Sequence, residues 1–382
     1  MLNVSTSFDS GAIEVVALPT DPALPVHLKL AVRQDATTDP GCTFRQWFHF
    51  RLQGVQAKPC RIDLVNAGAC TYPRGWTDYR VVASYDRAEW FRVPTRYDGQ
   101  VLTIDHTPLR DSVYYAYFEP YSSEQHLNLL GRMDASPFAR VLRLGRTVDG
   151  RDLDAVVLGS RDPAARKIWV IARQHPGESM AEWFAEGMLE RLIDPADAVA
   201  RQLRARATVY VVPNMNPDGS ARGNLRANAG GANLNREWQA PSPERSPEVY
   251  WVRERLMRTG VDAFVDVHGD EALPYVFVAG NEMLPAFNAE QALSLNRFRD
   301  EFSRSSPDFQ SVHGYPVGQY AAEALKLASK FVGHTFGCLS VTLEMPFKDN
   351  ANDPDEVRGW SSERSRHLGA AILAPLLCNL DR

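Results

Sequence analysis

Four apolar runs in the second half of the chain limit its possible folds more than any other feature. They are short, rich in β-branched residues and read KIWVIA, TVYVVP, VDAFVDV and CLSVTL, from Lys167, Thr208, Val261 and Cys338. Such runs are typical of buried strands. Helical patterns lie between and after them, at Met180–Leu192, Pro247–Arg258, Asn288–Ser303, Tyr320–Ala328 and Ser361–Leu377. Strands that alternate with helices predict an α/β domain with a mixed, mostly parallel sheet.

Chemically useful residues follow these runs at the point where each strand ends. His175 and Glu178 come after the first run, His268 after the third, and Glu344 ends the fourth. Because ligands bind outside the carboxyl ends of such strands, we expect these side chains to lie together. Two histidines and one carboxylate are the usual ligands of a catalytic zinc, although cobalt and nickel also suit them. Glu344 can then take a proton from a zinc-activated water, as a general base.

The Gly-rich stretch 223–238 adds Arg226, Asn235 and Arg236. A planar guanidinium beside an amide is well suited to hold a carboxylate through paired hydrogen bonds. A metal, a base and a carboxylate clamp together predict cleavage of the last peptide bond of a chain.

The first third of the chain has a different pattern. Short β-like runs recur about every ten residues between residues 12 and 121, with turn signals such as Asp98-Gly99 between them. We predict an antiparallel β-sandwich in residues 1–120 and the α/β domain in residues 121–382, the latter beginning with a hairpin at 139–159. We interpret the many aromatic residues of the sandwich as core, with a carbohydrate- or peptide-binding face as the alternative.

Composition excludes several classes of protein. The chain has 382 residues and a net charge of −5, without a basic block, so nothing in it suggests nucleic-acid binding. No apolar run is long enough to span a membrane, and the amino terminus lacks the basic start of a signal peptide. Five cysteines without a Cys-x-x-Cys pair argue against a disulfide framework. We expect a soluble cytoplasmic protein with reduced thiols.

The motifs resemble those of the zinc carboxypeptidases, and among them the cytosolic carboxypeptidase subfamily. The resemblance covers roughly residues 121–382, and a β-sandwich before the peptidase domain is also typical of that subfamily. Six motifs carry it, at His175-Pro176-Gly177-Glu178, Asn216-Pro217-Asp218-Gly219, Gly223-Asn224-Leu225-Arg226, Leu234-Asn235-Arg236-Glu237-Trp238, Asp266-Val267-His268-Gly269 and Thr342-Leu343-Glu344-Met345.

The resemblance implies one zinc per chain and a role for each site residue. The zinc ligands would be His175, Glu178 and His268, and Glu344 would be the general base. Arg226 would stabilise the oxyanion that develops on the scissile carbonyl. Asn235 and Arg236 would bind the terminal carboxylate of a peptide or protein substrate. The family also uses a mobile tyrosine upstream of the base, for which Tyr320 is the candidate.

The chain departs from the family pattern at two places and leaves its specificity open. Asn233 stands where the family commonly has Asp, and Asp270-Glu271 follows His268-Gly269. We expect neither departure to touch a metal ligand. Lys330, or Lys326, would favour an acidic terminal residue such as glutamate; the alternative is a lysine on a solvated helix face.

Two other functions fit part of the pattern. One is a zinc amidohydrolase that deacylates an N-acyl amino acid, in which Asn235 and Arg236 would also bind the carboxylate. The other is a non-catalytic peptide-binding module, in which the site has lost its activity. The sandwich and the Asn-Pro-Asp-Gly segment favour the carboxypeptidase. The sequence leaves the oligomeric state open.

Overall fold

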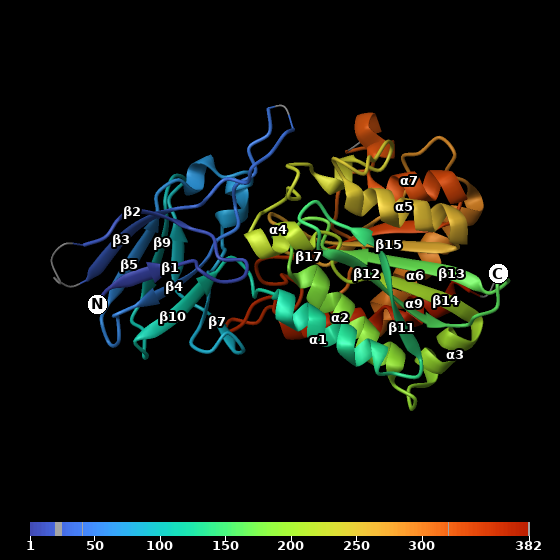
Figure 1. Ribbon diagram of the computed structural model, residues 1–382, viewed down its shortest axis with the longest axis horizontal. Coiled ribbons are helices and arrows are strands. Elements are labelled where there is room, and N and C mark those ends of the chain that lie inside the picture. Colours follow the sequence, from blue (N-terminus) through green and yellow to red (C-terminus); the bar gives the residue numbers. More distant parts are fainter. Residues whose placement is uncertain (20–24, 40, 320, 381–382) are drawn as a thin grey trace.

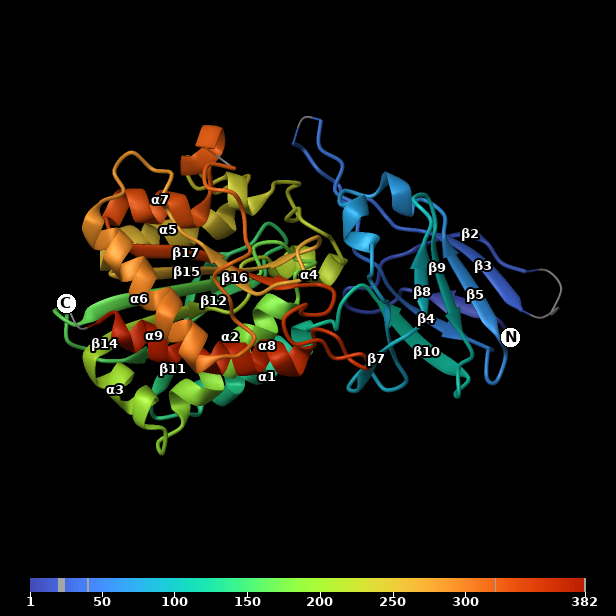
Figure 2. The same ribbon diagram turned by 180° about the vertical axis from the view of Figure 1, so that it is seen from behind.

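Two β-rich parts make up the computed structural model of the protein, which describes residues 1–19, 25–39, 41–319 and 321–380. Figure 1 shows the amino-terminal sheets on one side and the larger α/β part on the other. The view from behind shows the same division, with the two parts packed against each other (Figure 2).

The amino-terminal part consists of two five-stranded sheets, in the orders β1-β4-β10-β6-β7 and β2-β3-β5-β9-β8. Paired strands are antiparallel except β3 and β5, which are parallel. The predicted sandwich is confirmed, and most of its aromatic rings lie in the core, Trp47, Phe48 and Tyr115 among them. Its elements are β1 (Asn3–Ser5), β2 (Glu14–Ala17), β3 (Val26–Ala31), β4 (His49–Gln53), β5 (Cys60–Leu64), β6 (Val82–Ser84), β7 (Trp90–Arg92), β8 (Thr95–Tyr97), β9 (Leu102–His106), β10 (Ser112–Ala116) and the 3-10 helices η1 (Ala67–Ala69) and η2 (Pro73–Trp76).

A seven-stranded mixed sheet forms the centre of the second part, in the order β11-β12-β14-β13-β15-β17-β16. The four strands β14, β13, β15 and β17 are parallel neighbours, and the outer strands pair antiparallel. The mixed α/β fold is therefore confirmed. Its strands are β11 (Ala139–Arg146), β12 (Asp152–Gly159), β13 (Arg166–Ala172), β14 (Ala207–Val212), β15 (Ala263–Asp270), β16 (Phe277–Ala279) and β17 (Leu339–Pro346).

Helices cover both faces of this sheet (Figure 1). Trp169 and Ile171 of β13 pack with α5 and α7 on one face, while Ile168 and Val170 pack with the other helices on the opposite face. This strict alternation along a strand buried on both sides gives three layers. The helical elements are α1 (Ser123–Asp134), α2 (Met180–Ile193), α3 (Ala198–Arg206), α4 (Pro217–Arg222), η3 (Leu234–Arg236), α5 (Pro247–Thr259), α6 (Ala289–Ser305), η4 (Ala321–Lys326), α7 (Ala328–Phe336), α8 (Ser362–Ala371) and α9 (Leu373–Cys378).

Two predicted helices differ from the structure. Residues 321–326 form a 3-10 helix, which ends where Leu327 turns extended, and the α-helix follows at Ala328–Phe336. The helix predicted at Ser361–Leu377 is divided at Ile372 into α8 and α9. The helices α1, α3 and α4 were not predicted, because each of them buries only three residues.

Candidate metal centre and active site

The turn after β13 brings a histidine and a carboxylate to the same place. The N–H of Gly177 donates to the carbonyl oxygen of Leu225 at 3.0 Å, and a Cβ on Gly177 would lie 3.0 Å from that oxygen. A side chain at this position would therefore force Leu225 to shift by a few tenths of an ångström, whereas glycine lets the turn approach the neighbouring loop without that shift. His175 and Glu178 lie on either side of this contact, just before α2 begins.

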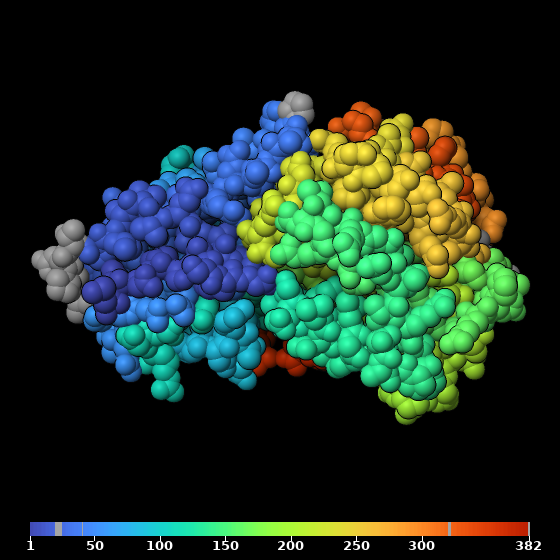
Figure 3. Space-filling model, in the orientation of Figure 1, coloured from blue at the N-terminus to red at the C-terminus, as the bar shows by residue number. Residues whose placement is uncertain are grey.

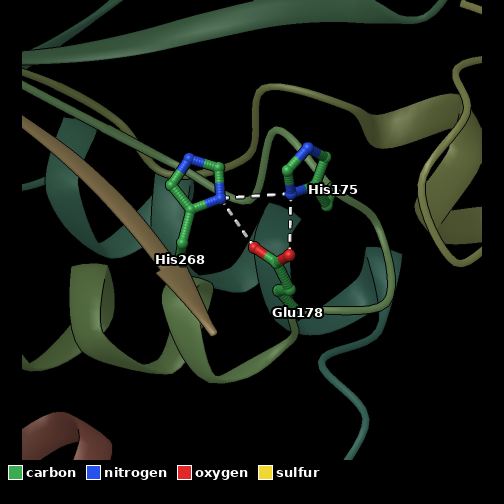
Figure 4. Close-up of side chains that lie close together, drawn as sticks. All are labelled: His175, Glu178 and His268. Carbon is green, nitrogen blue, oxygen red and sulfur yellow. Dashed lines mark hydrogen bonds and ion pairs between the residues drawn. The ribbon is translucent and has the colours of Figure 1, made fainter. Parts of the chain in front are cut away.

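The third member of the group comes from the neighbouring strand β15. His268 Nδ1 lies 2.7 Å from Glu178 Oε2 and 3.2 Å from His175 Nδ1, and His175 Nδ1 lies 2.7 Å from Glu178 Oε1 (Figure 4). All three side chains are buried, and one ligand atom from each lies within 4.8 Å of the others. Two imidazoles and a carboxylate that converge in this way fit a zinc ion, which takes nitrogen and oxygen ligands.

Each imidazole has a further partner on its other nitrogen. His268 Nε2 lies 2.9 Å from Asp266 Oδ2, and Gln174 Nε2 donates to the same carboxylate at 2.9 Å. His175 Nε2 lies 3.1 Å from Asn233 Oδ1. Such outer partners fix the orientation of metal-binding rings. The expectation that Asn233 touches no candidate ligand is therefore wrong: its loop folds back over the β13 turn, which sequence distance does not reveal.

Burial and charge act on the two histidines in different ways. Burial lowers the pKa of His175 to about 3, and the nearby positive charge of Arg226 acts in the same direction. Burial also acts to lower the pKa of His268, but Asp266 and Glu178 outweigh it and raise that pKa well above its ordinary value. Burial therefore favours the neutral ring of His175, the form in which a histidine can bind a metal ion, and the carboxylates around His268 attract positive charge.

Glu344 faces the same site because of strand register. β15 and β17 are parallel, and His268 lies directly opposite Glu344. Glu344 Oε2 is buried and has no hydrogen-bond partner among the described residues. Burial, with the negative charges of Glu178 and Asp270, raises the pKa of Glu344 well above its ordinary value, whereas a bound cation acts in the opposite direction.

A tyrosine that the sequence did not single out lies against this glutamate. The hydroxyl of Tyr315 lies 3.1 Å from Glu344 Oε1 and 2.6 Å from Asp270 Oδ2. The predicted candidate, Tyr320, lies outside the described residues. No local sequence pattern distinguishes Tyr315 from Tyr320, which follows it five residues later.

Arg226 lies beside the metal-binding group. Its Nη1 lies 2.8 Å from His175 Nδ1, and its Nε is buried without a hydrogen-bond partner among the described residues. A buried donor without a partner carries a desolvation cost that an oxyanion in the site would remove. The ring centre of Tyr72, from the amino-terminal part, lies 5.2 Å from the Arg226 guanidinium carbon.

The two residues of the predicted carboxylate clamp have partners of their own. Asn235 Oδ1 accepts from the N–H of Ala328 at 2.9 Å, and its Nδ2 lies 3.4 Å from His268 Nε2. Arg236 Nε donates to Glu323 Oε2 at 2.9 Å. Both residues line the same pocket as the metal-binding group.

This pocket has a volume of about 670 Å³ and extends from the metal-binding group to Lys330. Lys330 is buried at 6% exposure and donates to the carbonyl oxygen of Gly280. The alternative of a solvated helix face is therefore wrong for Lys330. Arg299 and Glu282, which pair at 2.8 Å, also line the pocket, so the side chains at this end carry two positive charges and one negative charge.

The sequence matches two known protein families in succession. Residues 4–118 match the cytosolic carboxypeptidase N-terminal domain, and residues 127–356 match the zinc carboxypeptidases. Cytosolic carboxypeptidase 6 of Mus musculus is 27% identical over 311 residues, which are 73% of this chain and 55% of the mouse protein. The chain therefore spans about half of that relative's length.

Solved bacterial structures resemble the whole chain. The metallo-carboxypeptidase of Burkholderia cenocepacia is 54% identical with a TM-score of 0.95, and the match covers 100% of this chain and 99% of that one. The metallo-carboxypeptidase of Pseudomonas aeruginosa, solved in complex with (2-guanidinoethylmercapto)succinic acid, is 44% identical with a TM-score of 0.92, and the match covers 98% of each chain. No helix in the described ranges is both long and apolar enough to cross a membrane. The chain belongs to the zinc carboxypeptidase family, as a zinc-dependent metallocarboxypeptidase that carries the cytosolic carboxypeptidase N-terminal domain.

Proposed function

We propose that His175, Glu178 and His268 hold the catalytic zinc and that Glu344 is the general base for hydrolysis of a carboxy-terminal peptide bond. One observation carries this proposal: the three ligand atoms converge, and strand register places Glu344 directly opposite His268. When bound, zinc supplies a Lewis acid that lowers the pKa of water from about 15.7 to about 7.

Residues of the chain carry out proton transfer, stabilise the oxyanion and bind the substrate. Glu344 accepts the proton of the attacking water and returns it to the nitrogen of the departing amino acid. Arg226 donates hydrogen bonds to the carbonyl oxygen as negative charge develops on it. Arg236 and the Nδ2 of Asn235 bind the terminal carboxylate of the substrate, which places the last peptide bond beside Glu344. Tyr315 lies against Glu344 and takes the place expected for Tyr320.

The substrate's terminal side chain is proposed to be acidic, with glutamate preferred. Lys330 and Arg299 place two positive charges at the end of the pocket, and Glu282, although its charge also acts on Lys330, forms a salt bridge among the described residues with Arg299. A buried ammonium whose one hydrogen-bond acceptor is a carbonyl oxygen favours an incoming carboxylate.

A basic terminal residue is the second candidate, because one observation favours it. Glu282 lines the same pocket, and the relative from Pseudomonas aeruginosa binds a compound with a guanidino group and two carboxyl groups. In this case Glu282 pairs with the cationic side chain of the substrate instead of with Arg299.

The test compares peptides that differ only at the last residue, ending in Glu, Leu or Arg, each with a free or an amidated carboxyl terminus. Release of glutamate from the free peptide, none from its amide, and loss of release after zinc removal are the expected results. Faster release of arginine would support the second candidate for the side chain and leave the reaction as proposed.

The other two functions give different outcomes in the same assay. Cleavage of N-acyl amino acids without cleavage of any peptide would support the amidohydrolase. A zinc-free protein that binds the peptides intact would be a binding module.

The location and the domain limits are also proposals. The cytoplasm is supported by the names of the cytosolic carboxypeptidases that the chain resembles. The limits 1–120 and 121–382 are supported by the capping box at Ser122, where α1 begins.

A further inference from the structure

We propose that the amino-terminal part completes the active site, because Asp35 and Tyr72 hold Arg226 in position. This inference rests on the catalytic role proposed for Arg226. Asp35 and Tyr72 would be positioning residues, which act through Arg226 and not on the substrate.

Asp35 fixes the backbone of the loop that carries Arg226. Its Oδ1 accepts from the N–H of Leu225 at 2.8 Å, and its Oδ2 accepts from the N–H groups of Arg226 and Ala227 at 2.8 and 3.0 Å. The side chain is buried, with Asp35 at 4% exposure. Three charge-assisted hydrogen bonds to consecutive residues leave this backbone little freedom.

Asp35 is itself held firmly in the amino-terminal part. Its own N–H donates to the carbonyl oxygen of Phe44 at 2.8 Å, and Phe44 belongs to the sandwich core. The position of the Arg226 backbone is therefore set by residues about 190 positions earlier in the chain.

Tyr72 contacts the guanidinium end of Arg226. Its ring lies 5.2 Å from the Arg226 guanidinium carbon, a distance at which a cation and an aromatic face attract each other. Gln46 holds Tyr72 through both backbone groups, since its Oε1 accepts from the Tyr72 N–H at 3.1 Å and its Nε2 donates to the Tyr72 carbonyl oxygen at 3.2 Å. Tyr72 also lines the pocket.

Arg226 depends on such support more than the pocket residues Arg236 and Arg299 do. Arg236 and Arg299 each pair with a glutamate, whereas the salt bridges among the described residues include none to Arg226. Without a carboxylate to fix it, the guanidinium is oriented by its backbone and by the surfaces beside it. Oxyanion stabilisation requires donors that are already oriented, so this orientation matters for rate.

Neighbouring contacts of the same segment supply a control. Thr38 Oγ1 accepts from Arg245 Nη1 at 2.9 Å and the Thr38 N–H donates to Gly231 O at 2.9 Å, away from residues 225–227. In Figure 3 the blue amino-terminal segments lie directly against yellow-green and yellow segments of the second part. Thr38→Val weakens this interface without touching Asp35 or Tyr72.

A double-mutant cycle tests the inference, with Asp35→Ala and Arg226→Ala singly and combined. We expect Asp35→Ala to lower kcat by about tenfold, with a smaller change in KM and unchanged zinc content, since one misplaced oxyanion donor costs at most about 10²–10³ in kcat. In the Arg226→Ala background the same substitution is expected to cost less than about twofold. Tyr72→Ala is expected to show the same dependence on Arg226, and Thr38→Val to retain wild-type kcat.

The outcomes separate this inference from the proposed function. If Asp35→Ala lowers kcat equally in the wild-type and the Arg226→Ala background, Asp35 has a merely structural role and the inference is overturned. A wild-type kcat in the Asp35→Ala variant would also overturn it. Wild-type activity in Arg226→Ala would overturn the proposed role of Arg226, and the inference with it. If Asp35→Ala does not fold, Asp35→Asn, which keeps the volume and loses the charge, enters the same cycle.

Discussion

Lys330 makes the proposed substrate preference depend on pH. Burial lowers its pKa from an ordinary value of 10.5 to about 8. The positive charge is present below pH 8 and is lost as the pH rises through that value. We predict that kcat/KM for a peptide ending in Glu is about 10 to 100 times that for a peptide ending in Leu at pH 7, because one charged hydrogen bond contributes about this much. This ratio should fall above pH 8.

The control for this prediction is Lys330→Met. Its ratio should be low and constant across pH 6.5–9.5, because the ammonium group of Lys330, whose loss of charge is the proposed cause of the pH dependence, is then absent. A wild-type ratio that stays constant across the same interval would contradict the proposed role of Lys330.

If Arg236 binds the terminal carboxylate of the substrate, as proposed, Glu323 competes with the substrate for it. The two side chains pair at 2.9 Å, although both are partly exposed, so the pair contributes less than about 1 kcal/mol. A substrate carboxylate must displace Glu323. We predict that Glu323→Gln lowers KM about two- to threefold and leaves kcat unchanged. Steady-state kinetics measure both, with Glu301→Gln, at another partly exposed glutamate, as control. An increase in KM would show that Glu323 orients Arg236 instead.

At the scale of elements, a buried ion pair joins the end of β13 to α2. Arg173 has a left-handed backbone (φ 58°), and its Nη1 donates to Glu182 Oε2 at 2.7 Å. Its Nε also donates to the carbonyl oxygen of Pro176 at 2.9 Å, inside the turn that carries His175. The pair therefore stabilises the geometry of the metal-binding turn.

We predict that Glu182→Gln lowers the free energy of unfolding by about 3 kcal/mol, because it leaves the Arg173 charge buried without its partner. Urea unfolding measures this change, and zinc content at limiting zinc should fall with it. Glu254→Gln, which removes an exposed pair with Arg258, should cost less than about 1 kcal/mol. Equal stabilities for the two variants would contradict the structural role of the pair.

The elements also show what the sequence can predict and what it cannot. His175, His268 and Glu344 were predictable because each follows or ends an apolar run, although β15 and β17 continue two residues beyond His268 and Glu344. Parallel strands bring their carboxyl ends to one edge of the sheet. Tyr315 was not, because a loop without periodicity gives no signal of what its side chains face. Asp35 was not, because its three partners lie in another part of the chain and only the packed structure brings them together.

At the scale of the whole molecule, Arg92 joins the two parts. It lies on β7, is buried at 8% exposure, and donates to the carbonyl oxygens of Phe347, Arg358 and Trp360 at 2.9, 3.0 and 3.0 Å. The Phe347 ring also stacks on Tyr117 at 4.4 Å. These contacts predict that the two parts unfold together.

We predict a single calorimetric transition for the wild-type protein. Arg92→Met leaves three carbonyl groups without their donor and should lower the free energy of unfolding by about 3 kcal/mol. Arg96→Gln, on the exposed face of the same part, should change it by less than about 1 kcal/mol. Two separate wild-type transitions, or an Arg92→Met variant as stable as the wild type, would contradict this prediction.

The central claim is that Glu344 is the base beside a zinc held by His175, Glu178 and His268. The most direct test is Glu344→Gln, with bound zinc and release of the terminal amino acid measured on the same preparation. We expect the variant to hold one zinc per chain, as in the wild type, and to lose about 10²–10⁴ in kcat, the usual contribution of a general base. Full zinc content with wild-type kcat would contradict it.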